Sequence, residues 1–117
     1  MRPLHAMFAL GLLAAGTAQA VTRYTDARIV EIETSDEQIH LFLEVLGGDS
    51  PPLGNGGTNL VPNRPYLMLA TSATEIASRK HMLGSALTAY STGAVVRIRW
   101  EDATATPNRV EYFLIRN

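Results

Sequence analysis

The chain has 117 residues, of which 46% are hydrophobic and 18% charged, and its formal net charge is −1. A domain that grips a nucleic-acid backbone is usually basic, so this balance speaks against nucleic acid as a partner. The absence of Cys excludes disulfides, thiolate-bound zinc and cysteine nucleophiles, so the fold must depend on packing, either within the chain or against copies of itself.

Residues 1–20 have the layout of a secretory signal peptide. Arg2 gives a positive start, Ala6–Ala15 is a short apolar core, and Ala18-Gln19-Ala20 is a small-residue end. We therefore expect cleavage after Ala20 and export, to the periplasm or out of the cell. The apolar run has roughly half the length of a membrane-spanning helix; a membrane anchor or a buried helix is the alternative. No other long apolar run follows, so we expect no membrane span.

Residues 21–117 are enough for a single domain with one core. The first part of this domain predicts a β-hairpin, because Ala27–Thr34 is rich in β-branched residues and Gln38–Val45 alternates between apolar and polar positions. Residues 35–37 supply a polar turn. We expect the residues before Ala27 to be a flexible N-terminus, although Tyr24, Thr25 and Asp26 are also placed to line an opening of a barrel.

The stretch 46–64 predicts a long irregular loop, because it holds five Gly and three Pro. Loops of this length are usually functional or mobile. A short apolar strand follows at Pro65–Ala70, with its Pro at the start, where a missing donor is tolerated.

A helix is predicted next. Ser72 with Glu75 three residues later fits a capping box, and Gly93 after Thr92 fits a left-handed cap. Gly84 inside the helix suggests close contact with a neighbouring backbone. One apolar stripe is expected to be buried, with three further apolar residues beside it: Ile76, Leu83, Leu87 and Tyr90, then Met82, Ala86 and Ala89.

Two further strands, Ala94–Glu101 and Arg109–Arg116, flank a turn-forming loop at 102–108. The predicted fold is therefore mainly β with one helix. Five strands with a helix between strands 3 and 4 are the plan of a five-stranded OB-fold barrel, which closes its sheet edges and binds ligands on an open face and loops. An open α+β sheet is the alternative.

A resemblance to a known family lies where the helix ends and the next strand begins. The residues are Leu87–Gly93 (LTAYSTG) and then Val95–Ile98 (VVRI). They resemble the subtilase cytotoxin B subunit and its exported relatives, in which a comparable helix ends in Tyr-x-Thr-Gly and leads into a strand beginning Val-Arg-Ile. Residue matches lie within Met82–Trp100, and the order of elements matches over the domain.

The resemblance implies an OB-fold and export. For toxin members it also implies a ring of five B subunits that binds cell-surface glycans and carries an enzymatic A subunit. The toxin subunit has cysteines and this chain has none. The toxin's sugar-contacting positions lie near its first strand, where this chain has no matching motif, so no glycan-binding residue is transferred. Many relatives are exported proteins without an evident A subunit.

Arg97 and Arg99 are the first candidates for ligand contact. On a strand they project to the same side, about 7 Å apart, and an Arg fork suits a carboxylate. The competing interpretation is a solvated pair of strand positions that form salt bridges with Glu111. Thr25 and Asp26 are further ligand-binding candidates at the barrel opening.

Tyr66 and Trp100 are candidate sugar-stacking platforms, but Trp100 is in phase with Val96 and Ile98 and is expected in the core. Small residues along the helix leave two alternatives open, burial on the chain's own strands or helix contacts in a ring. For the ring, the candidate contact residues are Met82, Ser85 and Ala89.

No pattern in the sequence indicates catalysis, a metal site or a cofactor. His40 and His81 lie far apart, and neither is part of a nucleophile motif or has metal-ligand spacing. We therefore expect a non-catalytic binding domain that recognises carbohydrate and forms an oligomer. The alternative is a periplasmic protein that binds a protein partner, through its 46–64 loop, without binding glycan.

Overall fold

The computed structural model describes residues 21–54, 63–103 and 108–116. The predicted signal peptide at 1–20 lies outside the described residues. Within them the protein is mainly β, as predicted, with six strands and two helices in the order β1, β2, β3, β4, α2, α3, β5, β6.

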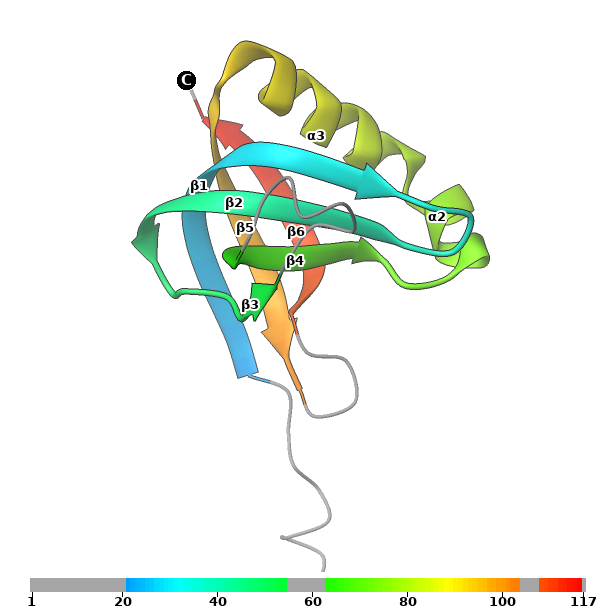
Figure 1. Ribbon diagram of the computed structural model, residues 1–117, viewed down its shortest axis with the longest axis horizontal. Coiled ribbons are helices and arrows are strands. Elements are labelled where there is room, and N and C mark those ends of the chain that lie inside the picture. Colours follow the sequence, from blue (N-terminus) through cyan, green and yellow to red (C-terminus); the bar gives the residue numbers. More distant parts are fainter. Residues whose placement is uncertain (1–20, 55–62, 104–107, 117) are drawn as a thin grey trace, which may run out of the picture.

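Strands β1 (Val21–Thr34) and β2 (Ile39–Gly48) form the predicted antiparallel hairpin. β1 is longer than expected: it begins at Val21, and its first part pairs with β5, from Val21 opposite Asp102 to Ala27 opposite Val96. The expectation of a flexible N-terminus at residues 24–26 was therefore wrong. β1 bends from the back layer of strands to the front layer (Figure 1), which lets it pair with β5 at one end and β2 at the other.

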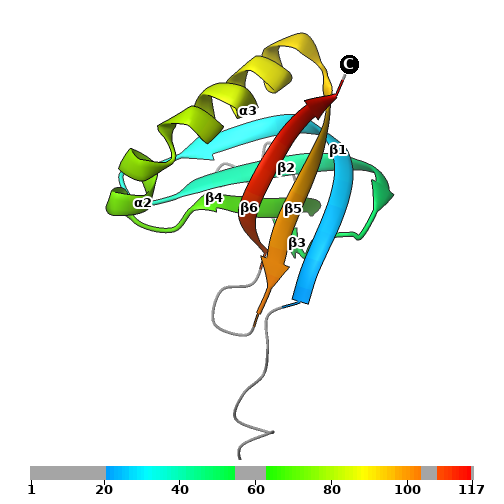
Figure 2. The ribbon, with the colours of Figure 1, turned by 180° about the vertical axis from the view of Figure 1, so that it is seen from behind.

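The other strands are β3 (Leu53–Gly54), β4 (Arg64–Ala70), β5 (Val95–Asp102) and β6 (Arg109–Arg116). The two-residue β3 lies within the predicted 46–64 loop and pairs with the start of β4. Seen from behind, β1, β5 and β6 run side by side (Figure 2).

The strand pairings can be followed in a circuit. β1 pairs with β2, β2 with β4, β4 with β6, β6 with β5, and β5 with β1. The weakest step is between β4 and β6, which share one parallel bridge, Met68 with Arg109. We call this place the seam.

Arg79 reinforces the seam with its side chain. Its guanidinium donates hydrogen bonds to the carbonyl oxygen of Leu69 on β4 (2.9 Å) and of Val110 on β6 (2.5 Å). Burial lowers the pKa of Arg79 from its ordinary value. Glu75 is close by and pairs with both Arg79 and Arg109. Charged hydrogen bonds thus take the place of missing ladder bonds.

The helical segment differs from the single predicted helix. α2 (Ala73–Ser78) and α3 (Lys80–Thr92) are separated at Arg79, whose backbone (φ −113°, ψ 24°) is not helical. Both predicted ends are confirmed. The Ser72 side chain accepts a hydrogen bond from the Glu75 N–H, and Gly93 adopts the left-handed conformation at φ 68°.

α3 lies across one end of the strands (Figures 1 and 2). It buries Ala86 and Ala89, while Leu87 and Tyr90 of the predicted stripe remain 47% and 46% exposed. The expected burial of these two was therefore wrong. Gly84 has no neighbouring atom where a Cβ would lie, so the expected close backbone contact is also absent from the described chain.

The core is built from inward-facing strand residues and the two helix alanines. Trp100 is 1% exposed, which confirms its predicted place in the core. Its indole N–H donates to the Thr25 hydroxyl oxygen at 2.8 Å, so its polar atom is satisfied inside. The fully buried members are Ala27, Leu41, Leu43, Leu67, Leu69, Ala70, Ala86, Ala89, Val96, Ile98 and Val110.

Candidate functional site

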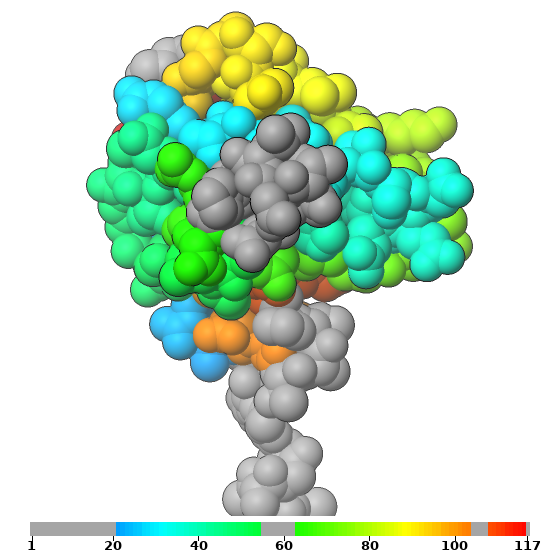
Figure 3. Space-filling view, in the orientation of Figure 1, coloured from blue at the N-terminus to red at the C-terminus, as the bar shows by residue number. Residues whose placement is uncertain are grey.

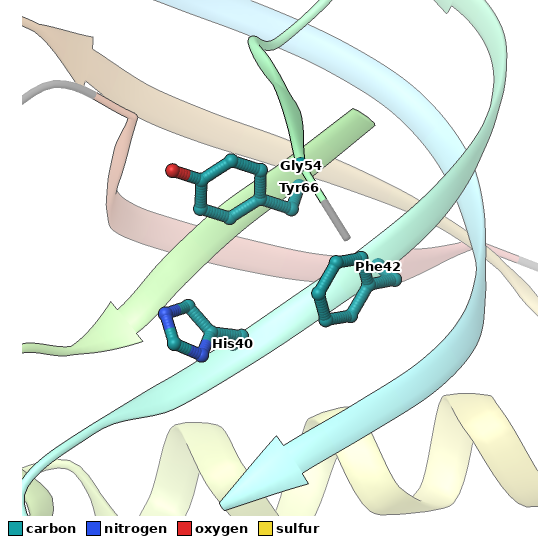
Figure 4. A pocket seen from close by; sticks show the side chains of 4 residues that line it. All are labelled: His40, Phe42, Gly54 and Tyr66. Atoms are coloured by element: carbon teal, nitrogen blue, oxygen red, sulfur yellow. The ribbon is translucent and has the colours of Figure 1, made fainter. Parts of the chain in front are cut away.

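A pocket of about 230 Å³ lies on the outer side of β2 and β4. It is lined by His40 and Phe42 from β2, Gly54 from β3 and Tyr66 from β4. The alternation of β2 explains their position, because Ile39, Leu41 and Leu43 turn into the core and the residues between them turn outward. Figure 4 shows the three rings arranged around a common space.

The three rings are mutually close. Ring centroids lie 6.2 Å apart for His40 and Phe42, 5.7 Å for His40 and Tyr66, and 5.8 Å for Phe42 and Tyr66. Phe42 lies opposite Tyr66 in the β2–β4 register, so the strand pairing itself fixes this arrangement. Phe42 is only 2% exposed although it lies outside the main core cluster. The result is a preformed aromatic wall of the kind that lines ligand pockets.

Gly54 is needed for the pocket's shape. A Cβ at this position would lie 2.7 Å from Cε1 of Tyr66. The missing side chain therefore lets β3 pass close over the Tyr66 ring, and a hydrogen bond from the Tyr66 N–H to the Pro52 carbonyl (3.0 Å) holds this approach.

Carboxylates extend the same surface onto β1. Glu31 lies opposite Phe42 and Glu33 opposite His40 in the β1–β2 register, and directly opposed side chains lie on the same side of a sheet. The Glu33 carboxylate is 3.4 Å from Nδ1 of His40. We call this surface, made of Glu31, Glu33, His40, Phe42, Tyr66 and Met68, the pocket face. Figure 3 views the molecule from the side on which β2, β3 and β4 lie in front.

The opposite layer carries a second outer surface. Two cross-strand rows run over β1, β5 and β6, Tyr24–Arg99–Tyr112 and Asp26–Arg97–Leu114. We call this surface the tyrosine face. Tyr24, Tyr112 and Leu114 are 48%, 44% and 45% exposed, so its apolar atoms remain in contact with water.

The predicted ligand residues Arg97 and Arg99 lie on the tyrosine face, on the same side of β5 as expected. Arg99 is 3.5 Å from Glu111, as the salt-bridge interpretation predicted, and 5.5 Å from the Tyr112 ring centroid. Arg97 does not follow that interpretation. It makes a bidentate pair with Asp26, at 2.9 and 3.0 Å.

Asp26 thus has a charge partner within the chain. The hydrogen bond from Arg97 holds the pKa of the Asp26 carboxyl below its ordinary value. Thr25 is fully buried, where its hydroxyl donates to the Asp49 carbonyl and accepts from Trp100. Neither residue reaches the pocket, so the structure does not bring Thr25, Asp26, Arg97 and Arg99 together with the aromatic rings.

The three residues predicted as oligomer contacts differ in their burial. Ala89 is fully buried and Met82 partly buried against the chain's own core. Ser85 is half-buried on α3. Of the two alternatives for this helix, burial on the chain's own strands therefore accounts for Ala89 and Met82.

No group of His, Cys, Asp and Glu suited to a metal ion occurs within residues 21–54, 63–103 and 108–116. In the same ranges no helix is long and apolar enough to cross a membrane. His40 and His81 stand apart, since His40 lies in the pocket on β2 and His81 is exposed on α3.

No family model, curated protein or solved structure matches the chain.

Tyr66 was a sugar-stacking candidate on its sequence, but His40 and Phe42 were not. Their signal was present, because two aromatic rings at alternate positions of a strand, out of phase with its core residues, must face outward together. What the sequence could not indicate is that β3 and β4 would enclose them.

Proposed function

We propose that this chain is an exported, non-catalytic OB-fold domain that binds carbohydrate in the pocket of His40, Phe42 and Tyr66. The observation that carries the proposal is the preformed aromatic pocket on the outer side of β2 and β4. Sugar rings present C–H faces that pack on aromatic rings, and aromatic lining with a few polar groups is the usual composition of a small-molecule site.

The circuit of strand pairings supports the OB-fold part of the proposal. An OB-fold is a five-stranded Greek-key barrel that uses the outer side of its second and third strands for ligands. With the short β3 set aside, β2 and β4 are the second and third strands of this chain. The pocket therefore occupies the surface that this fold would use.

A glycan array with the mature protein tests the carbohydrate proposal. We expect binding that is lost on Tyr66→Ala and retained on Tyr112→Ala, which removes a ring of the same kind from the tyrosine face. Absence of any glycan signal, or equal loss in both variants, would refute a carbohydrate site in this pocket.

Protein binding is the second candidate function, and the exposed tyrosine face favours it. Tyr24, Tyr112 and Leu114 leave apolar surface in water, and exposed aromatic residues with Arg are typical of protein contacts. The proposed partner is a further copy of the chain, as in the toxin-like ring that the resemblance implies. The part of the 46–64 loop at 55–62 lies outside the described residues.

The native mass of the mature protein tests this second function. We expect a multiple of the single-chain mass, five-fold for the toxin-like ring, that falls to the single-chain mass on Leu114→Glu. A single-chain mass in the unmodified protein would refute self-association and leave the pocket proposal unaffected.

A further inference from the structure

We infer that the carbohydrate recognised by the pocket carries a protonated amino group, that is, an amino sugar with a free ammonium. This inference rests on the proposed function, because it names the class of ligand for the same pocket. Three features of the pocket face lead to it: the aromatic rings, the carboxylates in their rows, and the placement of cationic side chains.

The aromatic rings favour a cation. A ring attracts a cation that lies within about 6 Å of its centroid, because the face of the ring is negative. The centroids of His40, Phe42 and Tyr66 lie 5.7 to 6.2 Å from one another. A group held over the space between them in Figure 4 is therefore within reach of the Phe42 and Tyr66 rings, which supply the attraction, while His40 borders the same space.

The carboxylates reinforce this preference. Glu31 and Glu33 stand in the same cross-strand rows as Phe42 and His40, and opposed Cβ atoms of a sheet are about 4.5–5.5 Å apart. Glu31 is thus the carboxylate beside Phe42 whose charge attracts an ammonium on a ring-bound sugar, whereas Glu33 is already engaged with His40 at 3.4 Å. Glu31 is half-buried, which weakens screening by water.

No Lys or Arg is among the described residues that line the pocket, which are His40, Phe42, Gly54 and Tyr66. The nearest Arg on the same side of β4 is Arg64, two residues before Tyr66 and exposed to water. Arg109, at the neighbouring strand, is paired with Glu75. An anionic sugar would lie beside the Glu31 carboxylate without a described Lys or Arg in the pocket wall to balance it, whereas an ammonium meets complementary charge.

The pocket size restricts the ligand to a small group. Pockets for drug-sized ligands span about 300–1,000 Å³, and this one has about 230 Å³. That volume suits a single sugar ring, with the rest of a glycan outside. The predicted ligand is therefore one amino-sugar residue of a longer chain or the free glycoside.

Titration calorimetry with the mature protein tests the inference, using three methyl glycosides that differ at one position: the glucosaminide, its N-acetyl form and the glucoside. The pH is near neutral, at which the sugar amine is still largely protonated. We expect the glucosaminide to bind roughly fivefold more tightly than the other two, in keeping with about 1 kcal/mol for a ring–cation contact.

Two variants locate the effect. Glu31→Gln keeps the shape of the side chain and should reduce the preference for the glucosaminide, to the part that the rings supply, while leaving glucoside affinity unchanged. Glu111→Gln removes the same charge from β6 and should leave the preference intact. An equal loss of preference in both variants would overturn the assignment of the carboxylates.

The remaining outcomes separate this inference from the proposed function. If the glucoside or the N-acetyl form binds as tightly as the glucosaminide, the ammonium is overturned and the carbohydrate pocket stands. If neither a glycoside nor tetramethylammonium binds, both are overturned. If tetramethylammonium binds and no glycoside does, the cation preference is supported and the carbohydrate assignment is overturned.

Discussion

The pocket face and the tyrosine face are built from the same kinds of residue, yet they use them differently. On the pocket face the rings surround a space, and Phe42 is 2% exposed beneath its neighbours. On the tyrosine face the rings are nearly half exposed, and the charges between them are paired within the chain, Asp26 with Arg97 and Arg99 with Glu111.

The difference leads us to expect separate uses for the two surfaces. Asp26, Arg97, Arg99 and Glu111 have little left to offer a small ligand, because a new partner must compete with the old one, and the same holds for Glu33 beside His40 on the pocket face. The rings of the pocket are already fixed in one arrangement, so binding a ligand costs little further side-chain entropy. We therefore expect small-ligand discrimination from the pocket face and broad contacts from the tyrosine face.

The largest expected difference between the faces is in stability. Phe42→Ala removes a buried ring and should lower the free energy of unfolding by about 3–5 kcal/mol. Tyr112→Ala removes an exposed ring and should cost at most about 1 kcal/mol. Urea unfolding of both variants measures this. Similar losses would mean that the two faces are not packed differently.

The seam joins the two faces, and its main side chain is Arg79. Arg79→Met keeps most of the stem but leaves the carbonyls of Leu69 and Val110 without their donor, so we expect a loss of about 2–3 kcal/mol in unfolding free energy. Arg64→Met, at an exposed position of β4, is the control and should change stability by less than about 0.5 kcal/mol. A loss below that control value would show that the guanidinium is dispensable.

Gly54→Ala is a smaller test, directed at the pocket face alone. The added Cβ would lie 2.7 Å from the Tyr66 ring, so either the ring or β3 must move. We expect this movement to lower the free energy of unfolding by about 1 kcal/mol or somewhat more. We expect glycoside affinity to fall more than stability, because the pocket wall itself shifts. Gly47→Ala, where the nearest atom is 3.9 Å away, should leave glycoside binding unchanged.

The smallest effect is expected from the charges of the tyrosine face and depends on pH. The folded-state pKa of Asp26 is lowered by Arg97, so the pair contributes stability above the unfolded-state pKa of about 3.9. That contribution is lost as pH falls through the lower, folded-state pKa. The stability difference between the protein and Asp26→Asn should be present at neutral pH and vanish in strong acid. A difference independent of pH would rule out the ion pair as its source.

The sequence predicted the parts of this molecule that depend on local signals. Ser72 and Gly93 define the ends of the helical segment, and the alternation in β5 placed Trp100 inside and Arg99 beside Glu111. Each of these follows from neighbouring residues, which act through periodicity and capping.

The remaining parts depend on contacts between distant residues. Arg97 pairs with Asp26 because of the register between β1 and β5, which no local pattern encodes. The helix breaks at Arg79, whose side chain bonds to strands on both sides of the seam. The pocket was missed for the same reason, since Phe42 becomes part of it only when β3 and β4 pair over it.

The seam has a consequence for the order in which the molecule folds. β1 and β2 are joined by a four-residue connection, whereas Met68 and Arg109 of the seam are 41 positions apart in the chain. Closing the longer loop costs more chain entropy, and this entropy is lost before the stabilising contacts of the seam have formed. The hairpin is thus expected early in the transition state, and the seam late. We therefore expect substitutions of Arg79 to change mainly the unfolding rate, and with it the lifetime of the folded state, while the folding rate stays nearly the same.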